Sequence, residues 1–482
     1  MGGRQVNFKY VKLLLVSFVL ACALVFAGGV AAVAEEADLP PGNAKKDNAE
    51  KDDAKKDDAK KKDPPDRYFA VTGATVHPVS GPVLEEASVL CKNGKIAAIG
   101  PNVEIPNGTK VLDAAGFHVY PGLVAVNGGG LPSGGTTQNG EDVYSLSLSL
   151  ALSGGITTTV SGDTAVKLSF GRIEAVDDLV LKRDIFARLP CRCGRMNFVS
   201  FFGGSSYRGY SSGRDVDSWR RFRQGLEDAR QYIRDKQAHE EKKKTDPKAP
   251  EPDKGKLSGD ASFALKLIRH EVTAVVSADM ARDLRDLASL ADKYDFKLVV
   301  RGAAEGWTVA PEMGRAGISA IITPRNRGDR NKRTNRPNGT SIENAKILHQ
   351  HGVPLAICPA SGGISLSGLA GRDLRHLPME AAFAVRGGLP REAALKAITL
   401  EAAKIVGVDH RVGSIEIGKD ADFAIVDGDM LHYMTMVRWT VVNGHVAYDK
   451  KKDSLLNHIR PDGDREAPAP DEYWPRRLGQ EQ

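Results

Sequence analysis

The chain has 482 residues, 41% of them hydrophobic and 27% charged, so it can bury a large core and exceeds a typical small single domain. Its formal net charge is +6. Three basic residues and no acidic residue lie in residues 1–34, which leaves 64 basic against 61 acidic residues in the rest. This near balance gives no indication of a nucleic-acid partner, and none is predicted.

Residues 1–34 have the pattern of a secretory signal peptide, with a basic start, an apolar run over residues 13–26 and a small-residue end at residues 32–34. We therefore predict an exported protein of the periplasm or cell envelope. An uncleaved anchor is the alternative, since the apolar stretch is nearly long enough to span a bilayer, and it would be the only contact with a membrane. Cys22 offers a lipoprotein as a third option.

Residues 35–66 form a Lys/Asp/Ala-rich linker with almost no apolar side chain to bury, and we predict it to be disordered. Residues 451–482 are read as a polar tail. The four cysteines beyond the leader lack the spacing of a metal or redox motif, so we expect buried thiols: Cys91, Cys191, Cys193 and Cys358.

Both ends of the chain between linker and tail are rich in predicted β-strands. Each end contains one Asn-Gly dipeptide, at residues 93–94 and 443–444, and this pair is the strongest short hairpin signal. The two β-rich ends are residues 67–120 and residues 409–450.

Between these ends, short apolar segments alternate with helical ones over residues 121–408. Such alternation is typical of parallel βα units, and this many units over about 250 residues indicates a barrel. A charged, proline-rich insertion is predicted at residues 237–258, after a helix that covers residues 219–236.

Four segments carry a resemblance to a known family. They are PGLVAVNGGG at residues 121–130, KLVVRGAAEGWTVAPE at 297–312, LPMEAAFAVRGGLP at 377–390, and the stretch from GLPREAALKAIT to FAIVDGD at 388–429. These segments resemble the amidohydrolase superfamily, and most closely its imidazolonepropionase-like subgroup. The resemblance implies a (β/α)8 TIM-like barrel with a composite β-sandwich domain built from the N- and C-terminal segments. It also implies hydrolysis of carbon-nitrogen bonds other than peptide bonds, with a divalent metal such as zinc as cofactor.

The positions that match the superfamily's metal ligands carry other residues. Its Asp-x-His-x-His motif falls on Ala125, Asn127 and Gly129. Glycine has no side chain to offer a metal, and a neutral amide is a poor zinc ligand. Lys167 does not lie in the context of the family's carboxylated lysine. We therefore predict a degenerate metal site and no cofactor, with these positions: Asn127, Gly129, Ser277, Arg301 and Ala360.

The same end of the barrel offers residues for a different ligand. Guanidinium groups recognise carboxylates, phosphates and sulfates through paired donors. We therefore predict a small polar or anionic partner molecule. For the basic loop at residues 325–337 itself, a solvated surface is the preferred interpretation and anion binding the alternative. The candidate ligand-binding residues are Arg301, Glu305, Arg325, Arg327, Asp373 and His376.

The preferred hypothesis is a metal-free paralogue in the cell envelope that binds such a ligand. The alternative is an active metal-dependent hydrolase with ligands rebuilt from Asp373, His376 and Glu305. A structural or partner-binding role through the linker and the basic loop comes third. The sequence leaves self-association into a homo-oligomer open.

Overall fold

The structure is a computed structural model, and all of its described residues lie within Pro64–Gln482. The residues described are 66–129, 131, 145–169, 179–196, 210–211, 214–246, 251, 257–328, 330, 332, 335–364 and 371–453. The predicted signal peptide, the linker up to residue 65 and the tail beyond residue 453 lie outside them. Among the described residues, no helix combines the length and the apolar character needed to cross a membrane.

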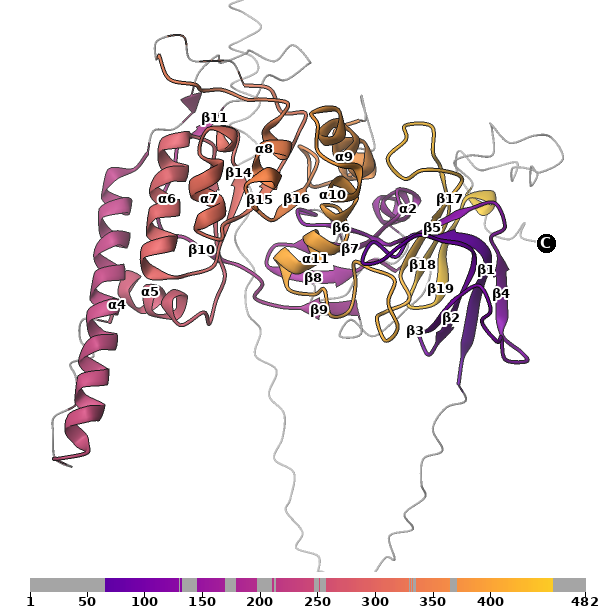
Figure 1. Cartoon of the computed structure of the whole chain (residues 1–482), viewed down its shortest axis with the longest axis horizontal. Helices are drawn as coiled ribbons and strands as arrows, with labels where there is room; N and C mark the ends of the chain where they lie inside the picture. Colours follow the sequence, from indigo (N-terminus) through magenta and orange to yellow (C-terminus); the bar gives the residue numbers. More distant parts are fainter. Residues whose placement is uncertain are drawn as a thin grey trace, which may run out of the picture. The chain divides into compact units, whose positions relative to one another are not determined.

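Strands from both ends of the chain form one sheet (Figure 1). The two groups join where β17 runs antiparallel to β5, with Phe423 opposite Pro121 and Val426 opposite His118. The order is β19-β18-β17-β5-β1-β2-β3, and β4 also pairs with β1. The strands are β1 (Tyr68–Val76), β2 (Leu84–Lys92), β3 (Lys95–Gly100), β4 (Lys110–Asp113), β5 (His118–Pro121), β17 (Phe423–Val426), β18 (Val437–Val442) and β19 (His445–Asp449).

Both predicted Asn-Gly hairpins are confirmed. Asn93 and Gly94 have φ values of 51° and 80°, and Asn443 and Gly444 have 50° and 70°. Positive φ at both central residues matches the right-handed twist of the paired strands, and Asn-Gly tolerates it best. The two turns lie against each other, because a Cβ on Gly94 would come within 3.1 Å of the Asn443 carbonyl oxygen.

Seven strands of the central region run parallel in two sheets, β6-β7 and β10-β13-β14-β15-β16. Backbone hydrogen bonds close the gap between β16 and β6, since Ile357 N donates to Ala397 O over 3.0 Å and Val124 N donates to Ile398 O over 2.9 Å. The strands are β6 (Leu123–Ala125), β7 (Ile156–Ser161), β10 (Ala187–Arg188), β13 (Ala274–Ala278), β14 (Leu298–Gly302), β15 (Ser319–Ile322) and β16 (Leu355–Ile357).

The barrel departs from simple βα repetition after β7. There β8 (Thr164–Lys167) and β9 (Val180–Lys182) pair antiparallel, β8 with β7 and β9 with β8. Two shorter strands, β11 (Arg195–Met196) and β12 (Tyr210–Ser211), pair only with each other.

Helices follow the parallel strands. The helices are α2 (Leu146–Ser153), α4 (Val216–Lys243), α5 (Asp260–Ile268), α6 (Ala281–Tyr294), α7 (Ala310–Arg315), α8 (Asn344–Gln350), α9 (Leu377–Arg386), α10 (Arg391–Lys396) and α11 (Leu400–Val406), with 3-10 turns η2 (Gly306–Thr308), η3 (Leu374–His376) and η4 (Lys450–Lys452).

The long helix α4 begins at Asp215, whose side chain accepts hydrogen bonds from the backbone N–H groups of Asp217 and Ser218. Its buried residues end at Ala229, and the helix continues to Lys243 with no further residue buried (Figure 1). The segment predicted as an insertion from residue 237 therefore starts as the exposed end of this helix.

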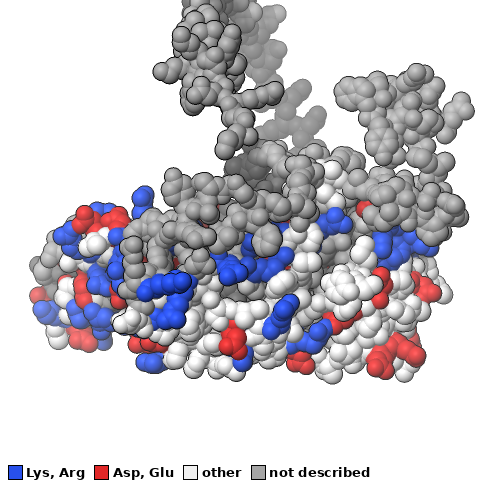
Figure 2. All heavy atoms as spheres, turned by 90° about the horizontal axis from the view of Figure 1, so that it is seen from above, with Lys and Arg blue, Asp and Glu red and all other residues white. Residues whose placement is uncertain are grey.

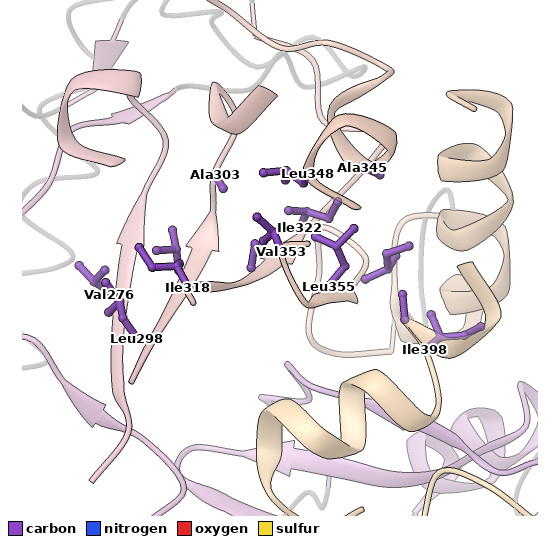
Figure 3. Close-up of a cluster of buried hydrophobic side chains, with 14 of the residues drawn as sticks. Val276, Leu298, Ala303, Ile318, Ile322, Ala345, Leu348, Val353, Leu355 and Ile398 are labelled. Atoms are coloured by element: carbon purple, nitrogen blue, oxygen red, sulfur yellow. The ribbon is translucent and has the colours of Figure 1, made fainter. Parts of the chain in front are cut away.

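Both faces of the parallel strands are buried. Figure 3 shows the side chains that lie between strands and helices, among them Val276, Leu298, Ile322 and Leu355. The alternate residues fill the barrel interior as a second cluster, which includes Val275, Val299, Ile321 and Ala356. Burial on both faces explains the continuous apolar runs that the sequence shows for these strands.

Candidate ligand site at the ends of the barrel strands

Arg301 points into the barrel interior near the end of β14. It pairs laterally with Ser277 of β13 on one side and Ile321 of β15 on the other. Val299, two residues earlier on the same strand, belongs to the interior cluster together with Ile321. Because side chains alternate along a strand, Arg301 faces the same interior.

The Arg301 guanidinium is half-buried and has no carboxylate partner among the described residues. Its Cζ lies 5.7 Å from the centre of the Phe186 ring. Its Nε is buried and has no hydrogen-bond acceptor in the described part of the chain. Burial lowers the pKa of Arg301 below its usual value, and the positive charge of Arg188 lowers it as well. Arginine nevertheless stays protonated in proteins, so a poorly solvated cation occupies this end of the barrel.

A cavity of about 370 Å³ lies beside Arg301, between the ends of β10 and β13 and the segment that follows β10. Its described lining contains no Asp or Glu. One lining arginine, Arg195, approaches the buried Asp279 carboxylate, with Nε 3.7 Å from Oδ2. The lining arginines are Arg188, Arg192, Arg195 and Arg301.

Basic side chains are also frequent on the surface. In the view from above, groups of Lys and Arg border the region drawn in grey (Figure 2). Arg327 is exposed and has no ion pair among the described residues, so it belongs to the solvated part of the basic loop.

The ends of β6 and β16 lie in contact. A Cβ placed on Gly362 would come 2.8 Å from the Asn127 carbonyl oxygen and 3.2 Å from the Gly129 nitrogen. Only glycine permits so close an approach of the two loops. The structure thus brings Asn127 and Gly129 beside the loop that contains Ala360, which is itself exposed.

The five positions that match the metal ligands of the amidohydrolase superfamily do not fit a catalytic divalent cation. They are Asn127, Gly129, Ser277, Arg301 and Ala360. They supply one amide, one hydroxyl and one guanidinium, while glycine and alanine supply no donor. A guanidinium cannot donate a lone pair and carries a charge of the same sign as the metal. No group of three or more His, Cys, Asp or Glu side chains that could hold a metal is found in the described ranges.

Glu305 does not face a ligand. Its side chain has no exposed surface, Oε2 accepts a 2.8 Å hydrogen bond from the Ala281 backbone N–H, and Oε1 accepts a 3.0 Å bond from the Gly339 N–H. Both oxygens therefore hold backbone in place. The prediction that Glu305 binds a ligand does not agree with these contacts.

Arg325 is already neutralised inside the protein. Its Nε donates to Glu380 Oε1 over 2.8 Å, and its guanidinium lies 5.3 Å from the centre of the Phe383 ring. Glu380 has no exposed surface; burial raises its pKa and the Arg325 charge opposes that rise. Arg325 is therefore paired with Glu380, and these contacts do not support its prediction as a ligand-binding residue.

Asp373 and His376 are brought together as predicted. Asp373 Oδ1 lies 2.6 Å from His376 Nδ1 across the turn η3, which precedes α9. Asp373 is buried, while a quarter of the His376 side chain is exposed, at 25%. Glu305 is tied to Ala281 and Gly339, so the three residues of the rebuilt-hydrolase hypothesis do not form one cluster.

Sequence reasoning missed Arg188 and Glu380. Arg188 ends a strand of two residues, which is too short to show a periodic pattern. Glu380 lies in the first turn of α9, where an acidic residue is typical of a helix start, and nothing local indicates that it is buried. The four cysteines in the described residues are free and buried, as predicted.

Comparisons with known proteins agree with this architecture. Residues 302–459 match the sequence model of the amidohydrolase family. An amidohydrolase from Thermotoga maritima superposes with a TM-score of 0.56 at 21% identity, over 79% of this chain and 100% of that one. This likeness confirms the predicted fold class, a TIM-like barrel with a β domain built from both ends.

Curated relatives match over shorter stretches. An N-acetylglucosamine-6-phosphate deacetylase from Danio rerio is 39% identical over 93 residues, which are 19% of this chain and 20% of that protein. The amidohydrolase tasK from Hapsidospora irregularis is 31% identical over 102 residues, 20% of this chain and 10% of that protein. The matched stretch thus spans a fifth or less of each relative.

Proposed function

We propose that the chain is a divergent member of the amidohydrolase superfamily whose barrel binds a small anionic molecule at Arg301; the family match over residues 302–459 and the shared fold support this membership. The single observation that carries this proposal is the half-buried guanidinium of Arg301, which has no carboxylate partner among the described residues.

The surroundings of Arg301 support an anion as the ligand. The 370 Å³ cavity lies within the range of small-molecule sites, and its lining includes four arginines and no described acid. A guanidinium presents several N–H donors in one plane, so it can bind two oxygens of a carboxylate, phosphate or sulfate at once. The Ser277 hydroxyl, one strand away at the same level, could donate a further hydrogen bond.

The donor set argues against the superfamily's usual reaction. When a divalent metal is bound in such a barrel, it activates water for attack on the substrate. Here Arg301 stands at one matching position, and Gly129 and Ala360 supply no ligand at two others. These positions therefore do not support metal-assisted hydrolysis. The predicted leader at residues 1–34 supports a binding function in the cell envelope.

The active-hydrolase alternative depends on Asp373 and His376, which do lie together. It predicts a metal-dependent rate on amide substrates such as N-acetylglucosamine 6-phosphate that is abolished by His376→Ala. The preferred function predicts no turnover above buffer with added zinc or manganese. A rate that His376→Ala removes would replace the binding hypothesis with the hydrolase.

Thermal unfolding with added anions tests the binding proposal. The probes are sulfate, phosphate, glucuronate and glucosamine 6-phosphate; the last follows from the phosphate named in the Danio rerio relative. A ligand that binds only the folded state adds about 2.7 kcal/mol at a hundredfold excess over its dissociation constant. At least one probe should raise the melting temperature, and Arg301→Ala should remove that rise.

Arg315→Ala is the matched control. Arg315 is an exposed arginine in the last turn of α7, which leads into the start of β15, so it lies toward the opposite end of the barrel from Arg301. Its loss should leave the anion effect intact. The proposal fails if no probe shifts the melting temperature, or if the shift survives Arg301→Ala.

A further inference from the structure

A second cavity, of about 580 Å³, lies between α9 and the segment that joins β17 to β18. It shares no lining residue with the cavity beside Arg301. Its volume falls in the range of small-molecule sites. The end of α2, at Ser153 and Gly154, and Tyr448 of β19 complete the wall, so barrel helices and the β domain both contribute to it.

Helix α9 presents two apolar faces. Leu377, Ala381 and Ala384 are buried against the barrel. Met379 and Phe383 lie on the adjacent face, are only half-buried and line the cavity. A helix that covers a barrel needs only one apolar face to be stable, and the second face is contacted by Arg325 but keeps exposed surface for another partner.

The opposite wall comes from the segment between β17 and β18. Met430 and Leu431 are buried and line the cavity. In the same segment, Tyr433 and Met436 line the cavity and are 80% and 38% exposed, and the neighbouring Met434 is 67% exposed. Such a group of exposed apolar side chains around a cavity is typical of a site that binds an apolar molecule. Methionine adapts its shape to different ligands, which suits this role.

The charged side chains that line the cavity are all basic among the described residues. The described residues that line it include Arg375, Arg386 and Lys450 and no Asp or Glu. Arg375 and Arg386 are exposed and have no ion pair among the described residues. His376 also lines the cavity, and Asp373 holds its Nδ1 at 2.6 Å, which fixes the ring and leaves Nε2 as the nitrogen that a ligand could contact.

We propose that this cavity, walled by α9 and the β17–β18 segment, is a second binding site for a small amphipathic carboxylate. The apolar body of the ligand lies between Met379, Phe383 and Met430. Arg375 and Arg386, which lie at the two ends of α9, supply the positive charge at the rim that attracts its carboxylate. Both parts of the lining are needed to bind such a ligand. A simple anion would leave the apolar walls exposed to water, and a neutral apolar molecule would leave the arginines without a negatively charged partner.

Isothermal titration calorimetry with octanoate tests the proposal, with acetate and 1-octanol as matched ligands. Octanoate should bind the full chain, whereas acetate should give no measurable heat and 1-octanol should bind at least tenfold more weakly. The double variant Arg375→Ala/Arg386→Ala should weaken octanoate binding at least tenfold and leave 1-octanol unchanged. Ala382→Trp, on the cavity face of α9, should abolish binding of both.

Two controls separate this site from the one at Arg301. Arg301→Ala and Arg315→Ala should both bind octanoate like the unchanged protein. The proposal is overturned if Arg301→Ala removes octanoate binding, or if the double arginine variant binds it normally. If Ala382→Trp does not fold, the double variant alone decides, because both of its arginines are exposed. A dimer that Tyr433→Ser dissociates, without octanoate binding in either form, would assign the surface to a second copy of the chain instead.

Discussion

Lys167 on β8 and Arg301 on β14 are two cations withdrawn from solvent, and their surroundings are opposite. Lys167 has no exposed surface, and its Nζ lies 2.7 Å from Asp420 Oδ2 and 2.9 Å from Asp422 Oδ2. It also donates a hydrogen bond to Asn443 Oδ1. Arg301 is half-buried and has no carboxylate partner in the described residues, only the ring of Phe186.

This difference indicates that Lys167 has a structural role, whereas we propose that Arg301 binds a ligand. Lys167 joins the barrel region to the β domain, because Asp420 and Asp422 immediately precede β17. A buried charge with such partners is complete within the protein. The burial of Arg301 costs desolvation free energy that no described carboxylate offsets. A binding site tolerates this cost because a bound anion supplies the missing negative charge.

The largest expected effect is the loss of Lys167. Lys167→Met would leave two carboxylates with 3% exposure each without their shared cation. Removing one partner of a buried ion pair typically costs about 3–5 kcal/mol of the free energy of unfolding. Urea unfolding followed by circular dichroism measures this loss.

Lys95→Ala is the matched control for Lys167→Met. Lys95 contacts the same Asp420 carboxylate at 3.3 Å, but its side chain is 58% exposed. Exposed ion pairs are worth less than about 1 kcal/mol, so the control should unfold close to the unchanged protein. Equal losses in the two variants would contradict the view of Lys167 as the cation that joins the two regions.

The contact of Lys167 with Asp420 and Asp422 is also an example of what could not be predicted from the sequence. The barrel, the two β-rich ends and both Asn-Gly hairpins follow from local patterns of apolar and turn residues. Lys167 meets Asp422 across 255 positions of the chain, and no local pattern reports such a contact. The antiparallel strands β8, which carries Lys167, and β9 were also missed.

The candidate site was predicted in part. Asn127, Ser277 and Arg301 were identified because they match positions at which the amidohydrolase superfamily carries metal ligands. Their neighbours were not, since the roles of Glu305 and Glu380 depend on burial, which an acidic residue at a helix start does not reveal. Alignment thus locates the site positions in the sequence. The charged groups that surround these positions can be identified only in the folded structure.

A smaller effect concerns pH. Burial raises the pKa of Asp420, but Lys167 and Arg411 outweigh it, so its pKa in the folded protein lies below 3.8. A carboxyl group with a lowered folded pKa contributes stability that is fully present above its unfolded pKa and is lost as pH falls through the folded value. Urea midpoints should therefore stay level from pH 7 to 5 and drop below about pH 4.

The same titration sharpens the role of Lys167. In Lys167→Met, Asp420 keeps Arg411 but loses its buried partner, so its folded pKa should rise toward the unfolded value and the loss of stability below about pH 4 should become smaller. In Arg301→Met the acid profile should not change, because no described carboxylate pairs with Arg301. An unchanged profile in Lys167→Met would show that Asp420 does not depend on Lys167.

The smallest expected effect is that of Arg301→Met without ligand, and it has the opposite sign to Lys167→Met. Methionine is apolar and of similar length, so it can pack against Phe186 and removes a cation that no described carboxylate offsets. The free energy of unfolding should stay unchanged or rise by about 1 kcal/mol, as measured by urea unfolding in chloride buffer. Added phosphate or sulfate should then stabilise the unchanged protein and not the variant. A loss of more than about 2 kcal/mol on Arg301→Met would be of the size expected for breaking a structural contact, and Arg301 would then belong with Lys167 and not with a ligand.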